Sequence, residues 1–181
     1  MGSYLAQDTS GRSSTTETLL DPRPDAACKR LRESRDQQDA CEAIREIVSN
    51  LIGCEEMALF QVTHSRKRFS MIWSFGIERG KVHLPKLLSE SALSEVIAGH
   101  AYIRDGFGVP ETAEGEKARA FVPIRFNGET AAVLVLLRLL PQKTKIDVLD
   151  RELFAVISRE AGKPLFSAAS RGRQNLKGSD D

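Results

Sequence analysis

Two apolar runs, separated by a single Asn-Gly pair, dominate the hydrophobic pattern of this chain. They occupy residues 119–140, RAFVPIRFNGETAAVLVLLRLL. Asn127-Gly128 is the strongest short-range signal for a two-residue hairpin turn, because both central positions of such a turn need a positive φ. So tight a turn predicts three cross-strand pairs, namely Phe126 with Glu129, Ile124 with Ala131, and Val122 with Val133.

Both faces of this hairpin are apolar along most of its length. Strands that are buried on both faces belong in the middle of a sheet that is covered on two sides. Pro123 complicates that position, since proline donates no ladder hydrogen bond and prefers an edge strand or a bulge. The face opposite the three pairs is expected to carry Phe121, Pro123, Ala132 and Leu134.

Helical and strand periods alternate before the hairpin. From Leu31 to Ile52 apolar residues recur at helical spacing, and Gly53 ends the pattern as a left-handed cap would. The segments 57–64 and 68–77 predict two strands joined by a charged turn. In the second strand, alternation is expected to place four large side chains on one face: Phe69, Met71, Trp73 and Phe75.

The remaining pattern predicts helices on either side of the hairpin. A short helix follows Pro85 and is closed by Gly99, and AYIRD, at 101–105, indicates a short strand. Residues 105–118, which are rich in glycine, are expected to form an irregular loop. The last helix is expected to begin at the N-cap Asp147, with Asp150 in its first turn, an apolar stripe of Leu149, Leu153, Val156 and Ile157, and an end or kink at Gly162 and Pro164.

This order of elements resembles the GAF domain, a sensory module related to PAS domains. The resemblance covers roughly residues 35–168 and implies an α+β fold with a central antiparallel sheet of five or six strands and helices on both faces. Many GAF domains have a glycine in the second hairpin strand, where this chain has Thr130-Ala131-Ala132. The residues that carry the resemblance are Val122-Pro123-Ile124, Asn127-Gly128, the run 133–137, Ile146, Asp150 and Leu153-Phe154.

The length of the chain indicates how many domains it has, and its charge limits the partners that are expected. A sequence of 181 residues favours one domain, expected at 25–168, with polar flexible tails at 1–24 and 169–181. Lys and Arg number 26 against 25 for Asp and Glu, so no net field favours nucleic acid as a partner. No apolar run reaches the roughly 20 residues of a membrane span, and we expect no membrane association.

The cysteines indicate a reducing compartment and no metal. Cys28, Cys41 and Cys54 form an odd set without a CxxC motif, which favours free thiols in the cytoplasm. No metal or cofactor motif is visible. One GAF branch reduces free methionine sulfoxide with cysteines around its pocket, so a small thiol-dependent enzyme is an alternative, although none of the three thiols falls in the expected pocket segment.

The resemblance implies two candidate functional surfaces. In GAF relatives a pocket lies between one sheet face and the segment before the hairpin, here 86–118, with Arg104 or Arg119 available to meet an anion. Its expected lining is Phe60, Trp73, Phe75, Tyr102, Arg104, Arg119 and Phe121. The same aromatic residues could simply fill the core.

The second surface is a dimer interface. In many relatives the first and last helices meet their copies in a four-helix bundle. The residues expected there are Leu31, Ile44, Val48, Leu51, Leu153, Phe154 and Ile157.

The sequence therefore favours a non-catalytic signalling or regulatory domain. It is expected to act through a homodimer or a signalling partner and to be modulated by a small-molecule ligand. Besides the thiol enzyme, a ligand-sensing component of a transcription regulator is the other alternative, suggested by fold analogy and by basic clusters at 29–35 and 65–68.

Overall fold

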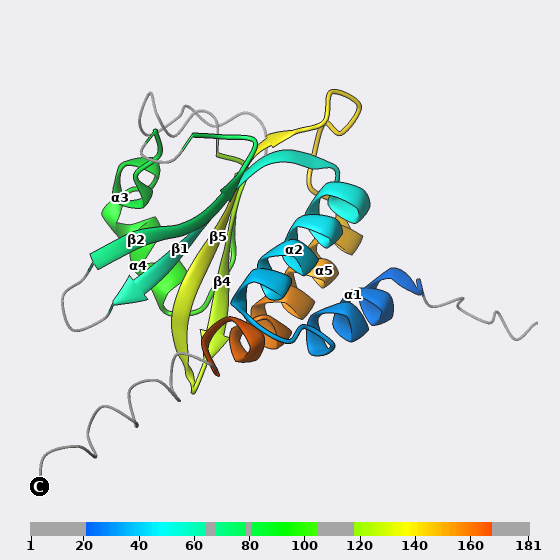
Figure 1. Cartoon of the computed structure of the whole chain (residues 1–181). Coiled ribbons are helices and arrows are strands. Elements are labelled where there is room, and N and C mark those ends of the chain that lie inside the picture. The colour runs from blue at the N-terminus through cyan, green and yellow to red at the C-terminus, as the bar shows by residue number, and fades with distance from the viewer. Residues whose placement is uncertain (1–20, 64–67, 79–80, 105–117, 168–181) are drawn as a thin grey trace, which may run out of the picture.

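A five-stranded antiparallel sheet forms the centre of the molecule (Figure 1). This computed structural model describes residues 21–63, 68–78, 81–104 and 118–167. The strand order β2-β1-β5-β4-β3 places the hairpin strand β5 in the middle. The strands are β1 (Cys54–Thr63), β2 (Arg68–Phe75), β3 (Tyr102–Ile103), β4 (Ala120–Phe126) and β5 (Glu129–Leu139).

The hairpin turn is the one that the sequence predicts. Asn127 and Gly128 have φ values of 53° and 85°. Nearly all of β4 and the middle of β5 are buried, as the two-faced apolar pattern predicts for strands covered on both sides. The predicted α+β fold with a central antiparallel sheet is confirmed.

A β-bulge changes the register beyond the turn. Phe126 pairs with Glu129, as predicted, but the register shifts between Ile124 and Arg125. Ile124 therefore pairs with Ala132 instead of Ala131, and Val122 pairs with Leu134 instead of Val133. Because one extra residue in a strand reverses its alternation, two of the three predicted pairs were wrong.

The bulge also exchanges the faces of β5. Ala132 and Leu134 lie in the same core cluster as Val122 and Ile124, whereas the sequence pattern placed them on the opposite face. Phe121 shares the other core with Val133, Val135 and Leu137.

Pro123 lies where β4 lacks a neighbour on one side. The two-residue strand β3 pairs only with Ala120 and Phe121, so the described residues include no strand beside Pro123 on that side. Such a position tolerates a residue that cannot donate a ladder hydrogen bond.

One side of the sheet carries three helices, of which the first packs mainly against the other two (Figure 1). The predicted continuous helix from Leu31 to Ile52 is instead interrupted, because Asp36 adopts an extended backbone and its side chain accepts a hydrogen bond from the Asp39 N–H as a new N-cap. Gly53, with φ 81°, ends the second helical segment in the left-handed conformation, as predicted. The elements are α1 (Arg23–Arg32), α2 (Gln37–Ile47), the π-helical turn η1 (Val48–Ile52) and α5 (Val148–Glu160).

Helix α5 begins with the N-cap that the sequence predicts. The Asp147 side chain accepts from the Asp150 N–H, and the Asp150 side chain accepts from the Asp147 N–H in return. After α5 the chain bends at Ala161 and continues in helical conformation from 162 to 167. A Cβ on Gly162 would lie 2.0 Å from the Arg125 carbonyl oxygen, so only glycine allows this close approach to β4.

The opposite face is covered by two short helices, α3 (Leu84–Leu87) and α4 (Glu90–Ile97). They replace the single helix expected after Pro85, since Leu88 is extended and Ser89 caps α4 by accepting from the Ala92 N–H. Gly99 follows α4 with φ 101°. Within the described ranges, no helix has the length and apolar character needed to cross a membrane.

Candidate functional site

Three of the expected pocket residues lie together on the α3/α4 side of the sheet. Phe60 and Phe121 are only 2% and 0% exposed and belong to the core between the sheet and these helices. The half-buried Tyr102 ring lies 6.1 Å from the Phe121 ring. In the described part of this side, these aromatic rings act as core residues.

The two candidate anion-binding arginines lie at the end of the same region. The Arg104 guanidinium donates to the Leu87 carbonyl oxygen at 3.2 Å, and the Arg104 N–H donates to the Arg119 carbonyl oxygen at 2.9 Å. Arg119 is exposed. The expected pocket segment 86–118 includes residues 105–117, which lie outside the described residues.

Trp73 and Phe75 are not brought together with the other expected pocket residues. A register shift opposite Leu59 and Phe60 leaves Ile72 as an extra residue in β2. Phe69 and Met71 pack against the α3/α4 core, whereas Ile72 and Trp73 pack against the core formed with α1, α2 and α5. The prediction that Phe69, Met71, Trp73 and Phe75 share one face was therefore wrong, because a bulge reverses the alternation of a strand.

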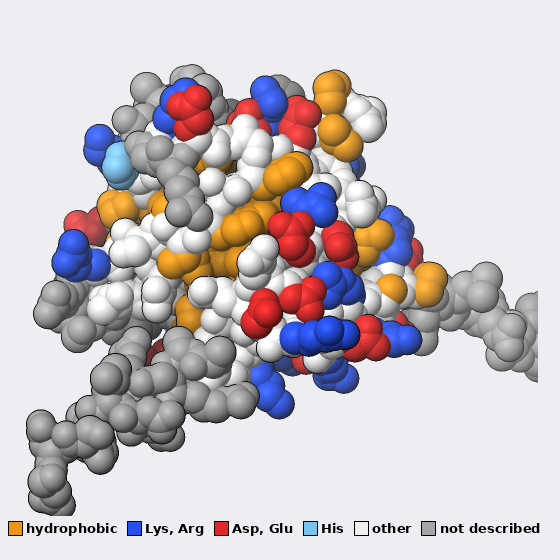
Figure 2. All heavy atoms as spheres, in the orientation of Figure 1, with side chains coloured by type: hydrophobic (Ala, Val, Ile, Leu, Met, Phe, Trp, Pro, Cys, Tyr) orange, Lys and Arg blue, Asp and Glu red, His pale blue; other side chains and the backbone are white. Residues whose placement is uncertain are grey.

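The bulge creates an aromatic surface on the edge strand β2. The Trp73 and Phe75 rings stack with centroids 6.5 Å apart, and the Arg45 guanidinium lies 5.5 Å from the centre of the Phe75 ring. Phe75 is 37% exposed. Figure 2 shows hydrophobic side chains gathered over this part of the sheet, beside the charged surface of α2. We call Trp73, Phe75 and Arg45 the β2 aromatic surface.

The residues expected at a helical dimer interface are almost all inside the protomer. Leu51 is half-buried, and the others are at most 2% exposed. Their side chains cover the protomer's own sheet, so they are not available to a second copy. The buried residues of this set are Leu31, Ile44, Val48, Leu153, Phe154 and Ile157.

Ion pairs connect the outer surfaces of these helices. Arg30 on α1 contacts both Asp39 and Glu46 on α2, at 2.9 and 2.8 Å. Arg32 on α1 contacts Glu160 on α5 at 2.8 Å. Together with the Lys29–Glu33 contact at 3.9 Å, these pairs neutralise much of the basic cluster at 29–35.

Two acidic residues of α5 have strong partners. Hydrogen bonds from Arg32 and then Arg159 lower the pKa of Glu160 from 4.5 to about 2. At the other end of α5, the Lys143 ammonium lies 2.7 Å from an Asp150 carboxylate oxygen. Burial lowers the pKa of Lys143, but its hydrogen bonds to Asp150 and Asp147 outweigh burial and raise that pKa overall.

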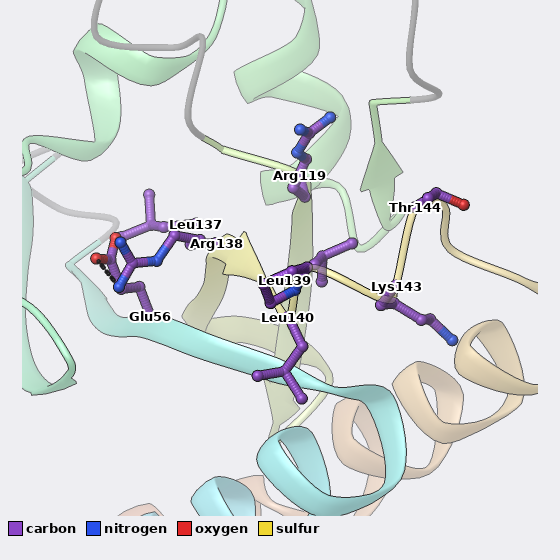
Figure 3. A pocket seen from close by; sticks show the side chains of 9 residues that line it. Glu56, Arg119, Leu137, Arg138, Leu139, Leu140, Lys143 and Thr144 are labelled. Carbon is purple, nitrogen blue, oxygen red and sulfur yellow. Dashed lines mark ion pairs between the residues drawn. The ribbon is translucent and has the colours of Figure 1, made fainter.

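A hollow at the end of β1 and β5 brings charged side chains near one another without making them converge (Figure 3). Its volume is about 550 Å³. Arg138 points to Glu56, at 2.9 Å, whereas Lys143 points toward the start of α5. Arg119 points away from both (Figure 3). The cations here serve separate contacts and do not surround a common point.

A second hollow contains an unusual set of charges. It has a volume of about 810 Å³ and lies between β4, the end of α4 and α5. We call it the β4–α5 groove. Sequence reasoning missed it, because its basic residues are scattered between positions 100 and 159. Those residues are His100, Arg125, Arg151 and Arg159.

Among the described residues, the thiols and imidazoles are not brought together. Burial raises the pKa of Cys41 and of Cys54 to about 11. His100 is exposed and its Nδ1 lies 2.9 Å from Glu95. Across the residues whose structure is described, no three His, Cys, Asp or Glu side chains are grouped so as to hold a metal ion.

The fold is that of GAF domains. No family model matches the chain, and no curated protein sequence matches it. The GAF domain of an Acinetobacter phosphoenolpyruvate-protein phosphotransferase matches 83% of this chain and 95% of its own length, with a TM-score of 0.62 and 13% identity. The GAF domain of the Coxiella burnetii phosphoenolpyruvate-protein phosphotransferase gives 0.57 and 15%, with the same coverage of both chains.

The GAF domain of the Escherichia coli potassium sensor histidine kinase KdpD is also similar. Its TM-score is 0.50 at 11% identity, and the match covers 86% of this chain and 98% of that one. The chain therefore has a GAF-like fold, as its sequence predicts. At these identities the likeness defines the fold alone.

Proposed function

We propose that this chain is a regulatory domain that acts by contact with a second copy of itself, made through the β2 aromatic surface. The observation that carries this proposal is the stacked pair Trp73 and Phe75, which is partly exposed on an edge strand. Large apolar side chains exposed next to each other mark an interaction surface more often than isolated ones do. GAF domains from a phosphotransferase and a sensor kinase share the fold, which supports a regulatory role.

The geometry of β2 supports self-association. β2 is the last strand of the sheet, and the described residues include no strand on its outer side. An open strand edge can pair with the same edge of another copy around a two-fold axis. Such pairing would place the two aromatic surfaces side by side. The helical stripes expected from the family resemblance offer little instead, because they are buried in the protomer.

The two faces of β2 also suggest how a ligand could modulate the contact. Phe69 and Met71 pack toward α3 and α4, and Trp73 packs toward α2 on the other face. A ligand that prefers one arrangement of α3 and α4 would shift the position of β2 and thereby the aromatic surface. The mechanism is a population shift, so the ligand's differential affinity for the two arrangements sets the size of the response.

The buried thiols favour a non-catalytic role. A thiolate is the reactive form of cysteine, and a pKa of about 11 leaves Cys41 and Cys54 almost entirely protonated near neutral pH. We therefore expect both thiols to react with a thiol reagent only after unfolding. Replacing all three cysteines by serine tests the enzyme alternative directly, because a thiol-dependent reductase would lose its turnover.

Sedimentation velocity of Phe75→Ser tests the proposed dimer. We expect the wild-type chain to dimerise with rising concentration and Phe75→Ser to weaken the dimer by about tenfold or more, the usual effect of losing an interface aromatic. Val148→Ser is the matched control, since Val148 is the other large hydrophobic residue exposed among the described residues and lies on α5. A wild-type chain that stays monomeric at the highest concentration would reject the proposal.

Tryptophan emission gives an independent measurement. The chain has one tryptophan, so its fluorescence reports on Trp73 alone. We expect the emission to shift to shorter wavelength as the dimer forms, because association removes water from this surface. A dimer that forms without any change in emission would place the interface elsewhere.

A further inference from the structure

The β4–α5 groove combines an apolar floor with a basic rim. Among the described residues of its lining, every ionisable side chain is an arginine or a histidine, and none is a carboxylate. The chain as a whole is nearly neutral, with 26 basic and 25 acidic residues. The uncharged lining residues are Gly99, Ala101, Ile103, Val122, Pro123, Phe154, Ala155 and Ser158.

The groove exists because β4 is longer than its neighbour β3. β3 pairs only with Ala120 and Phe121, so the later part of β4 has no described strand on the side away from β5. Val122 and Phe154 underlie the groove, but they are only 0% and 2% exposed. The apolar surface that a ligand can touch comes mainly from Ala101 and Ala155, which are exposed, and from Ile103, which is half-buried.

The spacing of two arginines gives the groove its length. Arg151 and Arg159 are eight residues apart on α5, which is about 12 Å along a helix axis. Ala155 and Ser158 lie between them on the same side of the helix and also line the groove. The arrangement favours an elongated ligand with separate anionic groups.

The third arginine is held at the β4 side of the groove. The Arg125 guanidinium lies 3.9 Å from the position that a Cβ on Gly99 would take, and it donates to the Gly128 carbonyl oxygen at 3.5 Å. Gly162 packs directly against the Arg125 backbone. Two glycines thus allow close packing around Arg125, which fixes its place between α4 and the end of α5.

Arg159 keeps donors for a ligand. Its Nε donates to Glu160 Oε1 at 2.7 Å, and Arg32 donates to both carboxylate oxygens of Glu160. A guanidinium has five N–H donors, so one such bond does not exhaust it. The Arg159 side chain is 65% exposed. Glu160 itself is not part of the groove lining.

We propose that the β4–α5 groove binds an extended acidic peptide segment of a partner protein. In an extended peptide, residues i, i+2 and i+4 point the same way, and four residues span about 13 Å. An acidic residue at each end then reaches Arg151 and Arg159, while an apolar residue between them lies against the exposed Ala155. The recognised pattern is acid–x–apolar–x–acid.

A nucleic acid fits this groove less well. Binding to single strands relies on aromatic rings on which successive bases stack. Phe154, the one aromatic residue among the described residues of the lining, is only 2% exposed. The aliphatic floor instead matches a leucine or isoleucine side chain. The positive charge of the rim and the apolar floor together favour a peptide that contains both acidic and apolar residues.

Fluorescence anisotropy with a labelled peptide tests this proposal. The probe contains the central sequence Glu-Ser-Leu-Ser-Glu, and its controls replace both Glu by Gln, both Glu by Lys, or Leu by Ser. We expect saturable binding of the probe, about tenfold or more weaker binding of each control, and a loss of affinity as salt rises. Equal binding of the Gln peptide, or tighter binding of a single-stranded oligonucleotide, would overturn the proposal.

Two variants locate the binding. The double variant Arg151→Gln/Arg159→Gln changes only exposed positions of α5. We expect it to bind the probe about tenfold or more weakly than the wild-type chain does. The double variant Arg68→Gln/Arg35→Gln is the charge-matched control, since neither residue lines the groove and both are exposed. Thermal melting of each variant checks that it is folded. If both double variants lose the same affinity, the peptide does not bind in this groove.

Discussion

The two faces of the sheet carry helical layers of unequal size. α1, α2 and α5 have 10, 11 and 13 residues, whereas α3 and α4 have 4 and 8. Among the described residues, the core on the larger side contains 26 buried residues and the core on the smaller side contains 13. Ion pairs between α1 and α2, and between α1 and α5, are added to the larger side only.

This difference indicates a division of roles. A layer with long helices and a large core resists local opening, while a layer of short helices opens at a smaller cost in free energy. We therefore infer that the larger layer holds the sheet in shape, and we propose that the smaller layer is the one whose arrangement a ligand would change. Three sets of measurements test this division. The first two compare a change in the larger layer with a similar change in the smaller layer, and the third removes an ion pair within the larger layer.

The largest effect is expected from removing a core leucine. Leu153 of α5 and Leu87 of α3 are 0% and 1% exposed and cover the sheet from opposite sides. Leu153→Ala is expected to lower the free energy of unfolding by about 3–5 kcal/mol, and Leu87→Ala by about 2–3 kcal/mol, because the single turn of α3 can move into the space left behind. Urea denaturation of both variants measures the difference. Equal losses would contradict the idea of a more adaptable layer.

A smaller effect is expected from removing a helix cap. Asp150 completes the capping box of α5 and contacts Lys143, so Asp150→Ala should cost about 1–2 kcal/mol of unfolding free energy. Ser89 caps α4 through one longer hydrogen bond of 3.3 Å, and Ser89→Ala should cost about 0.5–1 kcal/mol. Thermal unfolding compares the two. If the larger layer holds the sheet in shape, Asp150→Ala should lower the free energy of unfolding more than Ser89→Ala does.

The smallest effect concerns the ion pair between α1 and α5. The pKa of Glu160 is lowered from 4.5 to about 2, so its contribution to stability is fully present above pH 4.5 and is lost as the pH falls toward 2. Because Arg32 is 64% exposed, we expect that contribution to be only about 1 kcal/mol. Glu160→Gln should therefore be less stable than the wild-type chain at pH 7 and nearly equal to it at pH 2.5. An unchanged difference across this range would show that the charge of Glu160 is not its cause.

Local signals account for the parts of the fold that the sequence predicted. The turn at Asn127-Gly128 needs two positive φ angles, and Asp147 with Asp150 can cap a helix from neighbouring positions alone. Gly53 ends a helix for the same local reason. These features depend on residues close in the chain, and the antiparallel sheet between helical layers follows from the apolar pattern around them.

The candidate sites were harder to predict, because they depend on bulges and on packing. Extra residues at Ala131 and Ile72 reverse the alternation of β5 and β2, and no local composition marks either position. For that reason Trp73 left the face that it was expected to share with Met71. The β4–α5 groove depends on how far β3 extends beside β4, which the sequence pattern of either strand does not contain.

The sequence by itself determined the secondary-structure types, the hairpin and the GAF-like architecture, since these depend on periodicity, turn chemistry and capping between near neighbours. Only the tertiary structure decided which side chains share a face and which basic residues line one groove. The physical reason is that a single inserted residue in a strand turns every later side chain to the other side. Its position is set by the packing of helices against the whole sheet.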